Sequence, residues 1–313
     1  MSSYLVTGGA GFIGSHLVMR LLHDGHHVRI VDNLVTGSRA NLPEPERVDF
    51  IEADLANATI AQKAVQGMEF VLHQAAIPSV PRSVSDPVTS HRANVDATLN
   101  LLCAARDAKV ARLIFAGSSS VYGDTPTLPK HELMPTDPRS PYALQKFIGE
   151  QYSQLFTELY GLETTTIRYF NVFGPRQDPG SPYSGVISRF IKLLLAGEPP
   201  TIHGDGEQTR DFTYVDNVVD AVLAACSAPD AVGRVMNVAM GERTSLKQLL
   251  SMLSDIIGVA VEPIYLDPRE GDVRDSQADC ALAQEVLNYQ PRVSFQEGLR
   301  RTVDWYRQSS LHS

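Results

Sequence analysis

The stretch TGGAGFIG at residues 7–14 decides the fold of the first half of this 313-residue chain. A short apolar run, Tyr4–Val6, comes just before it, and a helical pattern, Ile13–Leu22, leads out of it. Glycines recur in the stretch at every third position: Gly8, Gly11 and Gly14. A GxGxxG spacing that starts at residue 9 is also present. Such a turn bends tightly and lets its backbone approach a pyrophosphate at a helix N-terminus. The stretch therefore predicts the strand–turn–helix unit of a dinucleotide-binding sheet.

The alternation of short β-branched runs and amphipathic helices continues along the chain. Strands are expected at Tyr4–Val6, Val28–Val31, Val48–Ile51, Phe70–His73, Leu113–Ala116 and Thr165–Arg168. Helices are expected at Ile13–Leu22, Asn94–Arg106 and Tyr142–Leu159. Strands that alternate with helices are joined by right-handed crossovers and pair in parallel. The predicted fold class is therefore α/β, a doubly wound parallel sheet of the Rossmann type.

The composition of the sequence changes after residue 171. Residues 175–185 are rich in proline, glycine, serine and aspartate, which is typical of a loop. Further helices are expected at Val186–Leu195, Ser245–Ile257, Leu282–Leu287 and Phe295–Arg307, with shorter strands between them. We therefore expect a dinucleotide-binding domain at 1–171 with a return segment at 212–240. A smaller C-terminal α/β substrate lobe would consist of 172–211 and 241–313.

Composition and charge exclude several classes of function. Hydrophobic residues make up 43% of the chain and charged residues 20%, the ordinary proportions of a globular protein. A net charge of −9 and a pI near 5.5 argue against a nucleic-acid or membrane-surface partner. No run approaches the length of a membrane span, and the N-terminus is unlike a signal peptide, so a cytoplasmic protein is expected. The three cysteines are widely spaced and the histidines show no metal-binding spacing, so no metal site is expected.

A carboxylate at the end of the second expected strand bears on the choice of cofactor. Asp32 lies 18 residues past Gly14, where it can accept hydrogen bonds from both ribose hydroxyls of a dinucleotide. Its negative charge would repel a 2′-phosphate, so NAD is favoured over NADP. Asp54 and Leu55, which follow the third strand, are placed to contact the adenine, although Asp54 could equally cap a helix.

The candidate catalytic residues lie in two later segments. In SPYALQK (140–146), Tyr142 and Lys146 are four residues apart and share one face of the expected helix. Because a nearby ammonium favours phenolate, we expect the pKa of Tyr142 to fall from about 10 towards neutrality, which suits a general base. Ser118 follows the strand Leu113–Ala116 and can bond a substrate hydroxyl and relay its proton to Tyr142. Together with the dinucleotide motif, these residues indicate hydride transfer at an alcohol.

These motifs resemble those of the extended short-chain dehydrogenases/reductases, and within them the UDP-hexose 4-epimerases. The matching segments are TGGAGFIG (7–14), VDN (31–33), HQAA (73–76), SSSVYGD (118–124), SPYALQK (140–146), RYFNVFGPRQDP (168–179), GDGEQTRDFTYVDN (204–217) and REGDVRDSQAD (269–279). Within that group the chain looks most like bacterial enzymes that interconvert UDP-N-acetylglucosamine and UDP-N-acetylgalactosamine. The resemblance implies NAD-dependent epimerisation at the sugar C4 through a transient 4-keto sugar, with UDP-glucose and UDP-galactose accepted too.

The resemblance also implies which residues hold the cofactor and the substrate. The cofactor-binding set gains Phe12, Ile13, Asn33 and Ala75, and both Tyr142 and Lys146 are expected to contact NAD as well. The substrate-binding set comprises Ser118, Ser119, Asn171, Arg210, Arg269, Asp272 and Ser276. Arg210 and Arg269 would neutralise the diphosphate, because an acidic protein needs local cations to hold an anionic substrate. Asn171 would bond the diphosphate region, and Asp272 would accept from the uridine ribose.

Ser276 carries the expectation about substrate choice. Relatives restricted to UDP-glucose tend to have tyrosine at this position, whereas a serine leaves room for an acetamido group, which Ser119 could bond. The family likeness also implies a homodimer. Apolar residues on the helices Asn94–Arg106 and Tyr142–Leu159 would then either fill the domain core or form a four-helix interface: Leu99, Leu102, Phe147 and Phe156.

Other readings of the same motifs stay open. A nucleotide-sugar 4,6-dehydratase would carry an Asp-Glu pair where this chain has Ser119 and Ser120. A UDP-glucuronate 4-epimerase would need a cation facing C6, and none can be assigned from the sequence. A non-catalytic NAD-binding sensor is the alternative from another class, although such proteins usually lose the tyrosine or the lysine that this chain keeps.

Overall fold

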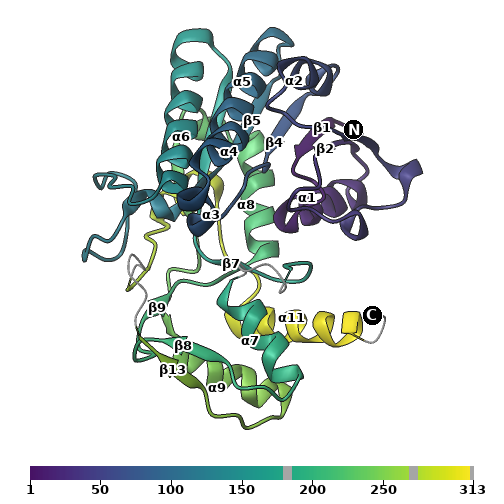
Figure 1. Ribbon diagram of the computed structural model, residues 1–313. Coiled ribbons are helices and arrows are strands. Elements are labelled where there is room, and N and C mark those ends of the chain that lie inside the picture. The colour runs from purple at the N-terminus through teal and green to yellow at the C-terminus, as the bar shows by residue number, and fades with distance from the viewer. Residues whose placement is uncertain (179–184, 268–273, 311–313) are drawn as a thin grey trace.

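A seven-stranded sheet forms the centre of the larger part of the molecule (Figure 1). The computed structural model describes residues 1–178, 185–267 and 274–310. The strands are β1 Ser3–Thr7, β2 His27–Asp32, β3 Asp49–Glu52, β4 Phe70–His73, β5 Arg112–Ser118, β6 Glu163–Tyr169 and β11 Val235–Val238. They pair in parallel in the order β11-β6-β5-β4-β1-β2-β3. Because the order runs outward in both directions from the β1–β4 pair, the predicted doubly wound α/β class is confirmed.

Helices cover both faces of this sheet (Figure 1). They are α1 Phe12–His23, α2 Ala58–Val65, α3 Val80–Ser85, α4 Pro87–His91, α5 Ala97–Asp107, α6 Pro141–Tyr160 and α8 Val215–Ser227. Successive side chains of a strand point to opposite faces, so Leu5 packs in the core beneath α2 and α5, whereas Val6 packs in the core beneath α1 and α8. The sheet is therefore buried on both sides, as expected for parallel strands.

The sequence sets the ends of α6, the helix that bears the candidate catalytic pair. Its first turn is capped by Ser140, whose hydroxyl accepts a hydrogen bond from the backbone N–H of Ala143 at 3.2 Å. Pro141 at the first helical position needs no hydrogen-bond acceptor. The helix ends at Gly161, which adopts a left-handed conformation with φ of 69°. Tyr142 consequently lies in the first turn, at the end of the helix that faces the carboxyl edge of the sheet.

Most of the remaining elements lie beyond that edge (Figure 1), whereas α10, Ala281–Leu287, packs against β11 and α8. The remaining elements are β7 Val172–Phe173, α7 Val186–Leu195, β8 Thr201–His203, β9 Thr209–Arg210, β10 Thr213–Tyr214, β12 Thr244–Ser245, α9 Leu246–Ile257, β13 Ile264–Leu266, α10 Ala281–Leu287 and α11 Phe295–Ser310. The strands form three pairs, β7 with β10, β8 with β13 and β9 with β12. Stacked rings of Phe212 and Phe295, 5.5 Å apart, join α11 to the segment before β10.

Most expected elements are found, with boundaries that shift by a few residues. All six expected strands overlap strands of the central sheet. The helix expected at Asn94–Arg106 begins instead as a π-helical turn, Arg92–Asp96, which continues into α5. Within that turn the Asn94 side chain makes tertiary hydrogen bonds to Ile77 and Gln145, which the local sequence pattern does not reveal. Among the described residues, no helix is long and apolar enough to cross a bilayer.

Candidate active site

The glycine-rich turn between β1 and α1 leaves no room for a side chain at Gly14. The N–H of Gly8 donates to the carbonyl of Val31 at 2.8 Å, and the N–H of Gly11 donates to the carbonyl of Gly8 at 3.0 Å. A Cβ on Gly14 would lie 2.1 Å from the Gly8 carbonyl oxygen. No side chain caps the start of α1, and its first turn, which includes Phe12 and Ile13, has no acidic residue. Its backbone N–H groups therefore suit a phosphate.

Asp32 closes the other side of this turn. One carboxylate oxygen accepts from the N–H of Ala10 at 3.0 Å, and the other accepts from the N–H of Leu34 at 2.8 Å. Burial raises the pKa of Asp32, and these two backbone hydrogen bonds hold that rise back. The side chain is 8% exposed, and each oxygen retains a lone pair. The carboxylate can therefore accept hydroxyl donors from a ribose.

The other expected cofactor contacts follow the carboxyl ends of neighbouring strands. Asn33 is exposed just after β2, and Asp54 is exposed just after β3, where its carboxylate accepts from the N–H of Ala56 at 2.9 Å. Asp54 thus stabilises a turn, while Asn57 caps α2. Leu55 is buried, and Ala75 follows β4, with its Cα and N 2.8 Å from where a Cβ on Gly8 would lie. The sheet thus brings the residues expected to bind the cofactor along one edge.

Ser118 and Tyr142 meet at the carboxyl edge of β5. Ser118 is the last residue of β5, and its hydroxyl shares a 2.8 Å hydrogen bond with the hydroxyl of Ser120. Burial raises the pKa of Tyr142 from 10.0 to about 12, and a hydrogen bond with Ser118 works against that rise. The expectation that a cation lowers the pKa of Tyr142 is therefore wrong for this structure. Desolvation of the phenol outweighs every other influence on it.

The position of Lys146 explains why it does not lower the pKa of Tyr142. Its ammonium donates to the carbonyl of Ala116 at 2.9 Å and lies 5.0 Å from the centre of the Phe115 ring. These contacts hold the charge beneath the edge of the sheet instead of against the phenol. Burial lowers the pKa of Lys146 from 10.5 to about 8, so the side chain is still mostly protonated at neutral pH.

Three of the described residues expected to bind substrate lie close together: Asn171, Arg210 and Ser276. The side-chain amide of Asn171 donates to the Ser276 hydroxyl at 3.1 Å and to the Asp211 carbonyl at 3.3 Å. The guanidinium of Arg210 donates to the carbonyls of Thr209 and Arg274 at 2.9 and 2.8 Å. Ser119 begins the 3₁₀ turn after β5. Arg269 and Asp272 lie outside the described residues.

Several residues near these sites were not identified from the sequence. The hydroxyl of Ser83 on α3 accepts from the backbone N–H of Tyr142 at 3.0 Å and so fixes the start of α6. The phenol of Tyr169, at the end of β6, donates to the Gln74 side chain at 3.0 Å. Neither contact has a signal in local sequence, because each joins residues separated by more than fifty positions. His73 is packed between the hydroxyls of Thr7 at 2.7 Å and Thr98 at 2.9 Å.

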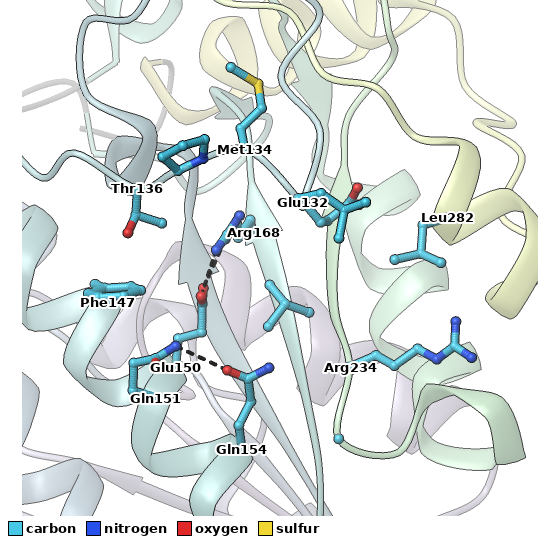
Figure 2. A pocket seen from close by; sticks show the side chains of 14 residues that line it. Glu132, Met134, Thr136, Phe147, Glu150, Gln151, Gln154, Arg168, Arg234 and Leu282 are labelled. Atoms are coloured by element: carbon cyan, nitrogen blue, oxygen red, sulfur yellow. Dashed lines mark hydrogen bonds and ion pairs between the residues drawn. The ribbon is translucent and has the colours of Figure 1, made fainter.

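A separate cavity of about 500 Å³ lies beside α6, away from these residues (Figure 2). At its base, the guanidinium of Arg168 donates to both carboxylate oxygens of Glu150, at 2.9 and 2.6 Å. Both side chains are almost fully buried, and the Arg168 guanidinium also lies over the Tyr122 ring at 4.7 Å. Because the two charges neutralise each other and none of the candidate catalytic side chains lines the cavity, it is not the active site. Within the described ranges, no cluster of His, Cys, Asp or Glu could hold a metal ion.

Comparisons with known proteins agree with this geometry. The family described as NAD dependent epimerase/dehydratase matches residues 4–239. A UDP-glucose 4-epimerase from Mycolicibacterium smegmatis is 43% identical over 311 residues, which cover 98% of this chain and 99% of the relative.

Two solved structures have nearly the same fold. The UDP-glucose 4-epimerase of Thermus thermophilus in complex with NAD has a TM-score of 0.90 and 38% identity, with 97% of this chain and 99% of that chain covered. The UDP-N-acetylglucosamine 4-epimerase from Methanobrevibacter ruminantium, in complex with UDP-N-acetylmuramic acid, has a TM-score of 0.94 and 41% identity, with 98% and 99% covered. The family expected from the motifs is confirmed: the chain belongs to the NAD dependent epimerase/dehydratase family and is an enzyme whose cofactor is NAD.

Proposed function

We propose that the protein is a UDP-hexose 4-epimerase that interconverts UDP-N-acetylglucosamine and UDP-N-acetylgalactosamine, and also UDP-glucose and UDP-galactose. The observation that carries this proposal is the meeting of Ser118 and Tyr142 at the carboxyl edge of β5, with Lys146 one turn further along α6. The glycine turn lies at the same edge, two strands away. A hydroxyl, a phenol and a cofactor cradle on one edge suit oxidation and reduction of a secondary alcohol.

The residues present fit NAD. The uncapped start of α1 would hold the pyrophosphate, and Asp32 would accept from the adenosine ribose. Lys146 would turn from the Ala116 carbonyl towards the nicotinamide ribose. When bound, NAD supplies a hydride acceptor and donor at the sugar C4, together with a positive charge near the phenol.

The chain itself contributes a proton acceptor that returns the proton to the same oxygen. Tyr142 would take the proton from the sugar O4, while the Ser118 hydroxyl bonds that oxygen and holds it in place. A pKa of about 12 means that the phenol rarely ionises in this structure, so formation of the complex with cofactor and substrate must lower it. Because Tyr142 gives the proton back to the rotated 4-keto sugar, the reaction needs no exchange of protons with water.

The segments that carry Asn171, Arg210 and Ser276 would bind the nucleotide sugar. Arg210 and Arg269 would neutralise the diphosphate, Asn171 would bond to it, and Asp272 would accept from the uridine ribose. Asn171 already lies 3.1 Å from the Ser276 hydroxyl, so the residues proposed for the diphosphate and for the sugar C2 adjoin each other.

Substrate choice is attributed to the small side chain of Ser276. A serine leaves space beside the sugar C2 for an acetamido group, to which Ser119 could donate, and the same space does not reject the plain hexose. The relatives support both sugars, since one is a UDP-glucose 4-epimerase and another is a UDP-N-acetylglucosamine 4-epimerase.

Proton NMR of the products tests the proposal. The purified enzyme is incubated separately with UDP-N-acetylglucosamine, UDP-glucose and UDP-glucuronate, without added NAD. We expect the galacto epimer of the first two sugars. Turnover of UDP-glucuronate alone would indicate the glucuronate epimerase, loss of the C6 hydroxyl would indicate a 4,6-dehydratase, and NAD binding without any turnover would indicate a sensor.

We also propose that two copies pair through α6 and the neighbouring α3 and α4. Of the four apolar residues expected to matter, Leu102 and Phe156 are buried in the domain core. The exposed apolar side chains lie instead on α3, α4 and α6: Val80, Val84, Val88, Leu144, Leu155 and Leu159. Static light scattering should give twice the chain mass, and Leu155→Glu should shift it towards the monomer. A monomer at all concentrations of the wild type would contradict the pairing.

A further inference from the structure

Asp211 is fully buried, and its carboxylate joins its own segment to residues 240–241 and to Ala278. One of its oxygens accepts from the backbone N–H of Met240 at 3.0 Å. The other oxygen accepts from the N–H groups of Gly241 and Ala278, each also at 3.0 Å. The side chain is 0% exposed. A carboxylate that accepts three N–H donors with no solvent contact fixes the relative positions of all three segments.

The joined segments carry the residues proposed for the nucleotide sugar. Arg210 directly precedes Asp211, and Ser276 lies two residues before Ala278. The backbone of Asp211 takes part as well: its N–H donates to the Ser276 hydroxyl at 3.4 Å, and its carbonyl accepts from Asn171 at 3.3 Å. Three described residues proposed for the nucleotide sugar are thus either adjacent to Asp211 or hydrogen-bonded to it: Arg210, Asn171 and Ser276.

We propose that Asp211 is the positioning residue of the proposed nucleotide-sugar site, where its carboxylate holds Arg210, Asn171 and Ser276 in register for the diphosphate and the sugar. This inference rests on the proposed function, because it presupposes that a UDP-sugar binds at these residues. Asp211 does not touch the cofactor turn or the candidate catalytic residues on β5 and α6. Its loss should therefore weaken substrate binding and leave hydride transfer and NAD retention unchanged.

The geometry explains why an uncharged isostere cannot replace this carboxylate. In Asp211→Asn, the amide oxygen can replace one carboxylate oxygen as the acceptor. The amide NH₂ then takes the place of the other oxygen and must face at least one backbone N–H. A donor facing a buried donor loses a charge-assisted hydrogen bond and forces the segments apart. Protonation of the carboxyl has the same effect, because it turns one acceptor oxygen into a donor.

The surroundings of Asp211 make that protonation accessible. Burial, and then repulsion from Glu242, raise the pKa of Asp211 from 3.8 to about 6, although the three N–H donors lower it. Cys280 and Tyr289 also face the carboxylate, and burial raises the pKa of each, so both stay neutral below pH 8. Between pH 5 and pH 8, Asp211 is therefore the group in this cluster whose charge changes.

The experiment compares Asp211→Asn with Asp216→Asn, a matched control whose partly exposed side chain lies in the first turn of α8. We expect Asp211→Asn to raise KM for UDP-N-acetylglucosamine, and the Kd measured by calorimetry, by about tenfold or more, the size of one charge-assisted hydrogen bond. The kcat and the NAD content should match the control. Equal KM and Kd in the two variants would overturn the inference alone. A wild type that binds neither UDP-N-acetylglucosamine nor UDP-glucose would overturn the proposed function as well.

A pH titration of the wild type covers the case in which Asp211→Asn does not fold. Binding needs the ionised carboxylate, so the Kd for a UDP-sugar should rise as pH falls through about 6 and level off above it. A UDP-sugar is the required probe, because its diphosphate is fully ionised across this range, whereas a terminal phosphate would itself titrate near pH 6. The Asp216→Asn control should show the same profile. A Kd that does not change between pH 5 and pH 8 would overturn the inference.

Discussion

Replacing Gly14 with alanine should release NAD from an otherwise folded protein. The new Cβ would lie 2.1 Å from the Gly8 carbonyl oxygen and 2.9 Å from the Gly9 Cα. Contacts of a Cβ below 3.0 Å do not occur in practice, so the turn must open by nearly 1 Å. Overpacking of this kind costs about 1–3 kcal/mol, of which the better helix propensity of alanine recovers up to about 1 kcal/mol. The fold should survive, but the backbone that faces the pyrophosphate is displaced.

The size of the effect on NAD follows from that displacement. Loss of one or two backbone hydrogen bonds to a charged phosphate corresponds to a Kd higher by about 10- to 1000-fold. NAD(H) extracted from the protein after gel filtration measures the retained cofactor, and thermal unfolding checks the fold. Gly11→Ala is the matched control, because its Cβ would meet the Gly8 oxygen at 3.1 Å, a contact that a small shift can relieve. Equal NAD content in the wild type and Gly14→Ala would refute the steric argument.

Three further changes test other parts of the molecule. Tyr142→Phe should lower kcat by about a thousandfold with NAD retained, as measured by product NMR and cofactor content; near-normal kcat would remove the phenol from the chemistry. Ser276→Tyr should reduce kcat/KM for UDP-N-acetylglucosamine far more than for UDP-glucose, with Ser276→Ala as the control that keeps the space. Equal losses on the two substrates would contradict selection by the size of this side chain. Glu150→Gln should lower the free energy of unfolding by about 3 kcal/mol, because it strands the buried charge of Arg168; denaturant curves that match the wild type would contradict this.

The parts of the structure set by local pattern could be predicted from the sequence. The strand–turn–helix around Gly14 is one, because spacing alone decides whether a backbone can turn that tightly. The start of α6 is another, since Ser140 and Pro141 are helix-start signals that can be read without any tertiary contact. The position of Asp32 at the end of β2 follows from counting along an alternating pattern.

The electrostatics of the candidate catalytic pair could not be predicted in this way. A spacing of four places Tyr142 and Lys146 on one face, but it does not say where the ammonium points. The nearby Ala116 carbonyl and Phe115 ring decide that, and both come from β5. Burial then sets the pKa of the phenol, and burial is a property of the assembled sheet and helices.

The three hydrogen bonds of the Asp211 carboxylate also could not be predicted from the sequence. In the sequence Asp211 is one acidic residue beside an arginine, which usually indicates a surface pair. Its three N–H partners belong to residues 240, 241 and 278, and no local pattern relates these positions. Contacts between distant segments are fixed only by the tertiary fold, which is why the cofactor turn could be predicted and this junction could not.

Epimerisation in D₂O, followed by proton NMR, tests the central claim most directly. The purified enzyme, with no added NAD, is incubated with UDP-N-acetylglucosamine until the composition stops changing. If hydride leaves C4 to the bound NAD and returns to the opposite face, UDP-N-acetylgalactosamine should appear with protium retained at C4. Absence of the epimer, or deuterium at C4 of the product, would contradict C4 epimerisation by internal hydride return.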